Sequence, residues 1–160
     1  MPSPPLPQSL KPSVLDRLID ACYEGSRAPT WYDAQGVIAS VRRDLEDLLN
    51  TRQTHQGLCD GFPELENSLI TFGLPDAASL LAVTPQQRLA LGRRIEQIIT
   101  RFEPRLKQVR VIVSDAIDPR RRVLEFAIHG RLQIEPAVDL ELNAALELTT
   151  GQLSVSAGPR

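Results

Sequence analysis

Glu103 and Arg105 are the residues whose types and spacing most strongly suggest chemistry. They flank Pro104, between an apolar-periodic segment and a run of alternating valines. A carboxylate and a guanidinium at such a joint can form an internal ion pair, or they can form a charged anchor that binds another protein in a fixed position. The residues alone leave both alternatives open.

Catalysis by this pair would resemble that of a glycosidase, which needs two carboxyl groups across a cleft. Glu103 would be the acid, with Asp115 or Glu135 as its partner. No pattern places two of these groups together, and Arg105 favours the ionised form of Glu103, which cannot act as a general acid. We therefore predict no enzymatic activity, and a peptidoglycan glycosidase that uses Glu103 is the alternative.

Metal, cofactor and nucleotide chemistry has no clear signature in the chain. Cys22, Cys59, His55 and His129 share no ligand-like spacing, and His129 falls on the predicted outer face of a strand. There is no phosphate-binding loop and no nucleophile-elbow motif. We predict neither a cofactor nor a metal site.

Nucleic-acid binding is also disfavoured, although basic residues cluster in one part of the chain. The net charge is −2, but residues 88–122 contain ten basic side chains and four acidic ones. They are spread over a helix, a strand and a turn, with Phe102 alone among them to stack on a base. We interpret the arginine-rich turn at 118–123 as a solvated loop or a contact for an acidic protein surface.

The bulk composition is typical of one soluble domain. The chain has 160 residues and 42% hydrophobic content, which is enough for a core. Its start lacks the charged head and apolar run of a signal peptide, and no run of apolar residues is long enough to span a membrane. With two cysteines in unrelated contexts, a reducing compartment is the simpler interpretation, so we expect a cytosolic protein.

The first part of the chain is predicted to be an arm followed by a helix. Residues 1–12 contain five prolines, which block helical and sheet hydrogen bonds, so we expect a flexible or polyproline-like arm. A single domain then spans residues 13–157. Its first helix begins at Ser13 and has an apolar face formed by Leu15, Leu18, Ile19 and Cys22.

A second helix is predicted from about Gly36 to Asn50, and a loop follows over residues 51–66. The apolar residues at helical spacing are Val37, Val41, Leu45, Leu48 and Leu49. The charged residues on the other side are Arg42, Arg43, Asp44, Glu46 and Asp47. We interpret that side, Asp44 included, as a solvated face.

A third predicted helix has clear start and stop signals. Residues 84–87 (TPQQ) form a capping box with proline at the first helical position. Pro104 disfavours helical geometry at Glu103, so the helix ends there. Its buried stripe consists of Leu91, Ile95, Ile98, Ile99 and Phe102.

Period-two alternation after this helix predicts an antiparallel sheet. Strands are expected around residues 109–113, 124–134, 138–148 and 153–155, with turns at 118–120, 135–137 and 149–152. Helices followed by a meander give an α+β fold, with the helices on one face of the sheet. An edge strand of this sheet offers unpaired backbone groups to a partner's strand.

Five motifs occur in an order that resembles a known family. They are residues 13–18 (SVLDRL), 48–52 (LLNTR), 68–76 (SLITFGLPD), 95–106 ending in FEPRL, and one C-terminal motif in two stretches, 124–136 and 146–155. Together they resemble the TssE family of type VI secretion baseplate subunits and, more distantly, the wedge proteins of contractile phage tails. Phe72 replaces the tyrosine of the family pattern SxxxYGLPD, and the proline-rich start is a second departure.

The resemblance implies a structural role. It implies a wedge complex with TssF, TssG and TssK, and a sheath of TssB and TssC that begins to polymerise on the protein. It places the protein in the cytoplasm, recruited to the secretion apparatus anchored in the inner membrane. Members of the family have also carried the label lysozyme-like.

The resemblance also assigns Glu103, Pro104 and Arg105 to sheath attachment. Because Pro104 fixes the backbone between the two charges, such a corner would lose little entropy on docking and could pair through Arg105. The alternative is an internal ion pair that locks the helix to the sheet.

Overall fold

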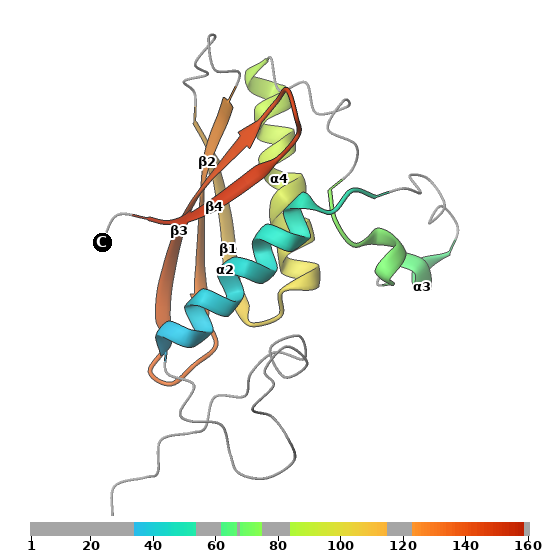
Figure 1. Cartoon of the computed structure of the whole chain (residues 1–160). Coiled ribbons are helices and arrows are strands. Elements are labelled where there is room, and N and C mark those ends of the chain that lie inside the picture. Colours follow the sequence, from blue (N-terminus) through green and yellow to red (C-terminus); the bar gives the residue numbers. More distant parts are fainter. Residues whose placement is uncertain (1–33, 54–61, 67, 75–83, 115–122, 159–160) are drawn as a thin grey trace, which may run out of the picture.

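The computed structural model describes most of the predicted domain. The described residues are 34–53, 62–66, 68–74, 84–114 and 123–158. The proline-rich arm, the predicted helix at Ser13 and most of the turn at 118–123 lie outside them. Within them, helices precede a sheet, and the predicted α+β fold is confirmed (Figure 1).

Four antiparallel strands form one sheet, in which they lie side by side in chain order (Figure 1). They are β1 (Leu106–Val113), β2 (Val123–Leu132), β3 (Val138–Glu147) and β4 (Leu153–Ala157). β2 and β3 pair over their whole length, and β1 and β4 are the two edge strands. The predicted meander is therefore confirmed.

Three α-helical segments and one 3-10 turn complete the described fold. They are α2 (Ala34–Asn50), α3 (Pro63–Glu66), η1 (Leu69–Thr71) and α4 (Pro85–Phe102). The capping box of α4 is confirmed, since the Thr84 hydroxyl accepts the Gln87 N–H at 3.2 Å and the Gln87 side chain accepts the Thr84 N–H at 3.0 Å. The loop prediction over 51–66 is wrong at α3, which is a single turn and too short to show a helical period.

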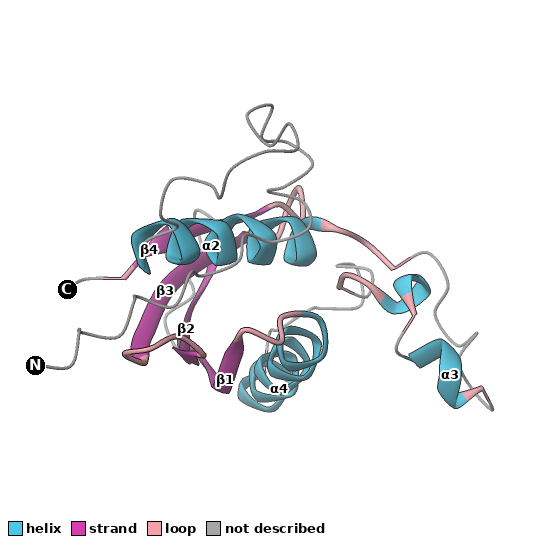
Figure 2. Ribbon diagram, turned by 90° about the horizontal axis from the view of Figure 1, so that it is seen from below, coloured by secondary structure: helices cyan, strands magenta, loops and turns pink. Residues whose placement is uncertain are grey.

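The helices α2 and α4 cover the same face of the sheet, and the core lies between them and the strands (Figure 2). Leu45 of α2 and Ile95 and Ile99 of α4 are fully buried against this face. Full burial of one such side chain contributes about 1.5–3 kcal/mol. The strand residues that share this core include Leu106, Leu124, Phe126, Ile128, Leu132, Leu142 and Leu146.

A bulge in β1 sets which of its side chains enter the core. The pairing of β1 with β2 shifts between Lys107 and Arg110, and Gln108 has a φ of 54°, in the left-handed region. One extra residue reverses the alternation of faces. Leu106 and Val111 therefore both face the helices, although an uninterrupted strand would put them on opposite faces.

Candidate functional site

At the joint between α4 and β1, Glu103 and Arg105 form an ion pair with each other on the two sides of Pro104. Glu103 is only 4% exposed. Its Oε1 accepts hydrogen bonds from the backbone N–H of Arg105 at 3.1 Å and from Arg105 Nε at 2.7 Å. Arg105 Nη2 also binds Oε2 of Glu103, so the guanidinium grips both carboxylate oxygens.

Arg105 extends this pair to α2. Its Nη2 donates to Asp44 Oδ2 at 2.6 Å, and its Nη1 donates to the Ser40 hydroxyl at 3.0 Å. The interpretation of Asp44 as part of a solvated face is therefore wrong. Ser40 and Asp44 are one turn apart at the border of the apolar stripe, and this spacing was the available signal that they face a neighbouring element.

The environment of Arg105 keeps its guanidinium charged. Partial burial by itself would lower the pKa of Arg105, but the hydrogen bonds and charges of Glu103, and then of Asp44, outweigh that effect and raise the pKa. Nε, Nη1 and Nη2 all donate hydrogen bonds within the chain, while the Arg105 side chain remains 28% exposed. Pro104, at the apex of the corner, is exposed.

The free edge of β4 is partly closed by Asn50, the last residue of α2. The Asn50 amide donates to the Leu153 carbonyl and accepts the Leu153 N–H, both at 2.8 Å, as a neighbouring strand would. In β4, alternate residues turn their backbone groups away from β3. After Leu153, these are Val155 and Ala157, and within the described part of the chain no further side chain closes the edge there.

The opposite edge, β1, is partly closed by α4. The Glu96 carboxylate accepts the outward-facing N–H of Val111 at 2.8 Å. Gly92 allows this close approach, because a Cβ there would lie 3.2 Å from a methyl of Val113 and 3.4 Å from the Val111 carbonyl. Each edge therefore has part of its outward-facing backbone bound by a helix residue, and at β1 the helix α4 also lies close to the strand.

The segment that carries the SLITFGLPD motif is tied to the end of α2. Leu74 N–H donates to the Thr51 carbonyl at 2.8 Å, and Gln53 N–H donates to the Leu74 carbonyl at 2.9 Å. Gly73 has a φ of 102°, a conformation that favours glycine. Phe72 meets Phe102 edge to face, with ring centroids 5.3 Å apart, so this ring packs without the hydroxyl of the family's tyrosine.

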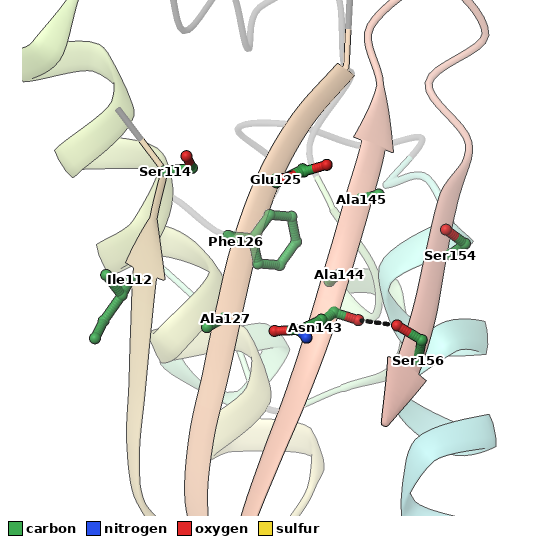
Figure 3. Close-up of a pocket in the computed structure, with 10 residues that line it drawn as sticks. All are labelled: Ile112, Ser114, Glu125, Phe126, Ala127, Asn143, Ala144, Ala145, Ser154 and Ser156. Atoms are coloured by element: carbon green, nitrogen blue, oxygen red, sulfur yellow. Dashed lines mark hydrogen bonds between the residues drawn. The ribbon is translucent and has the colours of Figure 1, made fainter. Parts of the chain in front are cut away.

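The outer face of the sheet, away from the helices, has a shallow hollow of about 480 Å³ (Figure 3). Its surface consists largely of small or polar side chains, including Ala127, Asn143 and Ser156 from β2, β3 and β4. Ile112 of β1 lies at one border and is 61% exposed. This face has the shape of a contact surface rather than a closed ligand pocket.

Other chemistry is sparse in the part of the chain that the structure describes. No group of three or more His, Cys, Asp or Glu side chains there has a metal-binding arrangement. None of its helices is long and apolar enough to cross a membrane. Glu135, a candidate partner of Glu103 in catalysis, is exposed beyond the end of β2, and Asp115 lies outside the described residues.

The fold and these contacts define a small helix-backed sheet, whose partly buried ion pairs hold its own elements together and whose last strand has a partly open edge. The family model described as baseplate wedge protein gp25 matches residues 36–137, and the chain belongs to this family. The resemblance found in the sequence motifs is thereby confirmed at the level of the family. The protein is a structural baseplate component.

A solved structure titled "The baseplate complex from the type VI secretion system" contains a similar chain. The two are 22% identical, with a TM-score of 0.49, and the match covers 68% of this chain and 93% of that chain. No curated protein matches the chain.

Proposed function

We propose that this protein joins the wedge of a type VI secretion baseplate and starts polymerisation of the contractile sheath. Its membership in the baseplate wedge family is the observation that carries the proposal. The five ordered motifs support the type VI assignment. The partners would be TssF, TssG and TssK in the wedge and TssB and TssC in the sheath, and the protein would act in the cytoplasm, at the membrane-anchored apparatus.

In this proposal, the first sheath subunit adds a strand to the open part of β4. The outward-facing backbone groups of Val155 and Ala157 would pair with that strand, and Asn50 would stop it before Leu153. Ala157→Pro tests this step, because it removes an outward-facing N–H and leaves the hydrogen bonds to β3 in place. We expect the Ala157→Pro protein to fold and enter baseplates but to start few sheaths. The control, Ala157→Val, should behave as wild type. Normal sheath growth with Ala157→Pro would refute strand addition at β4.

Glu103, Pro104 and Arg105 would form the second contact with the sheath. Pro104 is exposed, and the side chain of Arg105 is held by four partner atoms, so little conformational entropy would be lost when a sheath subunit docks. The same bonds support the alternative, in which the corner acts only as an internal lock. A test of attachment must therefore remove the charges and keep the fold.

The double variant Glu103→Leu with Arg105→Met meets this requirement, since apolar residues of similar volume often replace a buried ion pair without loss of stability. We expect a thermally stable protein that joins the wedge but supports few sheaths, counted by fluorescence microscopy of a labelled sheath subunit. The matched control is Arg131→Met with Asp139→Leu, which removes an exposed pair with an N–O distance of 3.9 Å. If the first variant builds normal sheaths, the corner is only an internal lock.

We further propose that the protein has no catalytic turnover. Both carboxylate oxygens of Glu103 are bound by Arg105, which leaves neither free to protonate a glycosidic oxygen. Purified protein should release no more soluble fragments from peptidoglycan than buffer does. Digestion that disappears in Glu103→Gln would instead establish the glycosidase alternative.

A further inference from the structure

A groove between α4 and β1 combines exposed apolar side chains with positive charge. It has a volume of about 470 Å³, and its border contains Leu89 of α4 and Ile112 of β1. These two side chains are 59% and 61% exposed. Large aliphatic side chains that share an open groove are typical of a surface that another protein covers.

The charge of the groove is opposite in sign to that of the whole chain. Among the described residues, the guanidinium groups of Arg88, Arg93 and Arg110 line it, against the carboxylate of Glu96. That carboxylate is already bound to the Val111 N–H. The described lining of the groove therefore has three positive charges and one negative charge, a net of +2, in a chain whose net charge is −2.

The geometry also restricts how an occupant can bind. Strand addition to β1 is obstructed, because Glu96 takes the outward-facing N–H of Val111 and Gly92 brings α4 against this edge. Nucleic acid is disfavoured because none of the described residues that line the groove has an aromatic side chain to stack on a base. Recognition must then use side chains, as when an amphipathic helix lies in a groove.

We propose that this groove binds an acidic, amphipathic segment of a partner protein. Carboxylates of that segment pair with Arg93 and Arg110, and one or two of its aliphatic side chains cover Leu89 and Ile112. The site is separate from the corner at Glu103 and from the β4 edge. Binding at this groove does not depend on sheath growth, so the groove proposal can hold even if the proposal on sheath initiation fails.

The test is a binding measurement with defined peptides on the full-length protein, by fluorescence anisotropy at low and high salt. The main probe is an acidic peptide of about 15 residues with leucines at helical spacing. The comparison probes are the same peptide with serine for leucine, a basic peptide with the same leucines, a single-stranded oligonucleotide, and a peptide copying residues 13–26 of this chain. We expect the acidic leucine peptide to bind at least about tenfold more tightly than the others, and to bind less tightly at high salt.

Variants then locate the site. Arg93→Glu with Arg110→Glu should weaken binding about tenfold or more, and Ile112→Ser about threefold. The matched controls are Arg42→Glu, an exposed arginine of α2, and Leu69→Ser, an exposed leucine of η1; both should stay within about twofold. Circular dichroism and thermal melts confirm that each variant is folded.

Five results would overturn the proposal, and four of them concern the designed probes and the variants. They are equal binding of the serine peptide, equal binding of the oligonucleotide, absence of measurable binding, and affinity that is unchanged in the double arginine variant. Tighter binding of the 13–26 peptide would also overturn it, since the occupant would then be a segment of this chain.

Discussion

Nη2 of Arg105 lies 2.6 Å from Oδ2 of Asp44, although the two residues are 61 positions apart in the chain. This contact joins α2 to the start of β1, and Glu103 adds the end of α4 to the same ion pair. The ion pairs of Arg105 thus hold together α2, α4 and the start of β1, three elements that contribute to the core. The charged corner is part of the fold itself, whatever it binds.

The first prediction concerns removal of this guanidinium. Arg105→Ala leaves the carboxylate of Glu103 buried without its counter-ion, so the free energy of unfolding should fall by about 3 kcal/mol. Chemical denaturation monitored by circular dichroism measures the change. Arg42→Ala, an exposed change on α2, should stay within about 0.5 kcal/mol of wild type. A loss below about 1 kcal/mol in Arg105→Ala would show that the ion pair contributes little to the fold.

The second prediction concerns pH. The pKa of Arg105 is raised in the folded protein, so its stabilising effect is complete below the ordinary arginine pKa and is lost only as pH rises through the folded value. The ordinary value lies above about 12. The stability difference between wild type and Arg105→Ala should therefore not shrink between about pH 7 and pH 10. Denaturation curves of both proteins across this range would reveal a shrinking difference, which would contradict the raised pKa.

The third prediction concerns the β4 edge. Asn50→Ala leaves the Leu153 N–H and carbonyl without their partner, which should cost about 1–2 kcal/mol. The exchange of the Leu153 amide hydrogen, followed by NMR or mass spectrometry, should become faster. Asn143→Ala, on the exposed outer face, should leave that amide unchanged. Slow exchange at Leu153 in Asn50→Ala would mean that another group protects this edge.

The fourth prediction compares two glycines with positive φ. A Cβ on Gly73 would lie 2.7 Å from the carbonyl carbon of Thr51, so Gly73→Ala should lower the free energy of unfolding by more than about 2 kcal/mol. Gly151, with a φ of 70° in the β3–β4 turn, should tolerate asparagine at a cost near 1 kcal/mol. Thermal melts measure both, and similar effects of the two changes would argue against the close contact of Gly73 with Thr51.

The regular elements could be predicted because each has a local signal. The capping box at Thr84 and the proline after Glu103 correctly predicted the two ends of α4. Period-two alternation correctly predicted β2 and β3. The bulge at Gln108 was not predicted. It changes the face on which the residues before it lie relative to those after it, but the valines after it still alternate, so their pattern gives no sign of it. The sequence shows the alternation but not the point at which it shifts.

The contacts of the site were harder to predict because they join distant parts of the chain. Asn50 was predicted to end its helix, which is correct, but its second role depends on Leu153, 103 residues away. Asp44 was assigned to solvent because a helix face was treated as either apolar or solvated. Polar residues at the border between those faces, such as Ser40, can reach a neighbouring element, and only the tertiary structure shows which one.

The same 103-residue separation has a consequence for synthesis of the protein. A ribosome adds roughly 5–20 residues per second, so roughly 5–20 s pass between the synthesis of Asn50 and that of Leu153. Until then, the apolar side of α2 has no β4 to pack against. During that time, a chaperone can bind the uncovered helix. We therefore expect translation that stops before Leu153 to produce a chain prone to aggregation and proteolysis, not a smaller working domain.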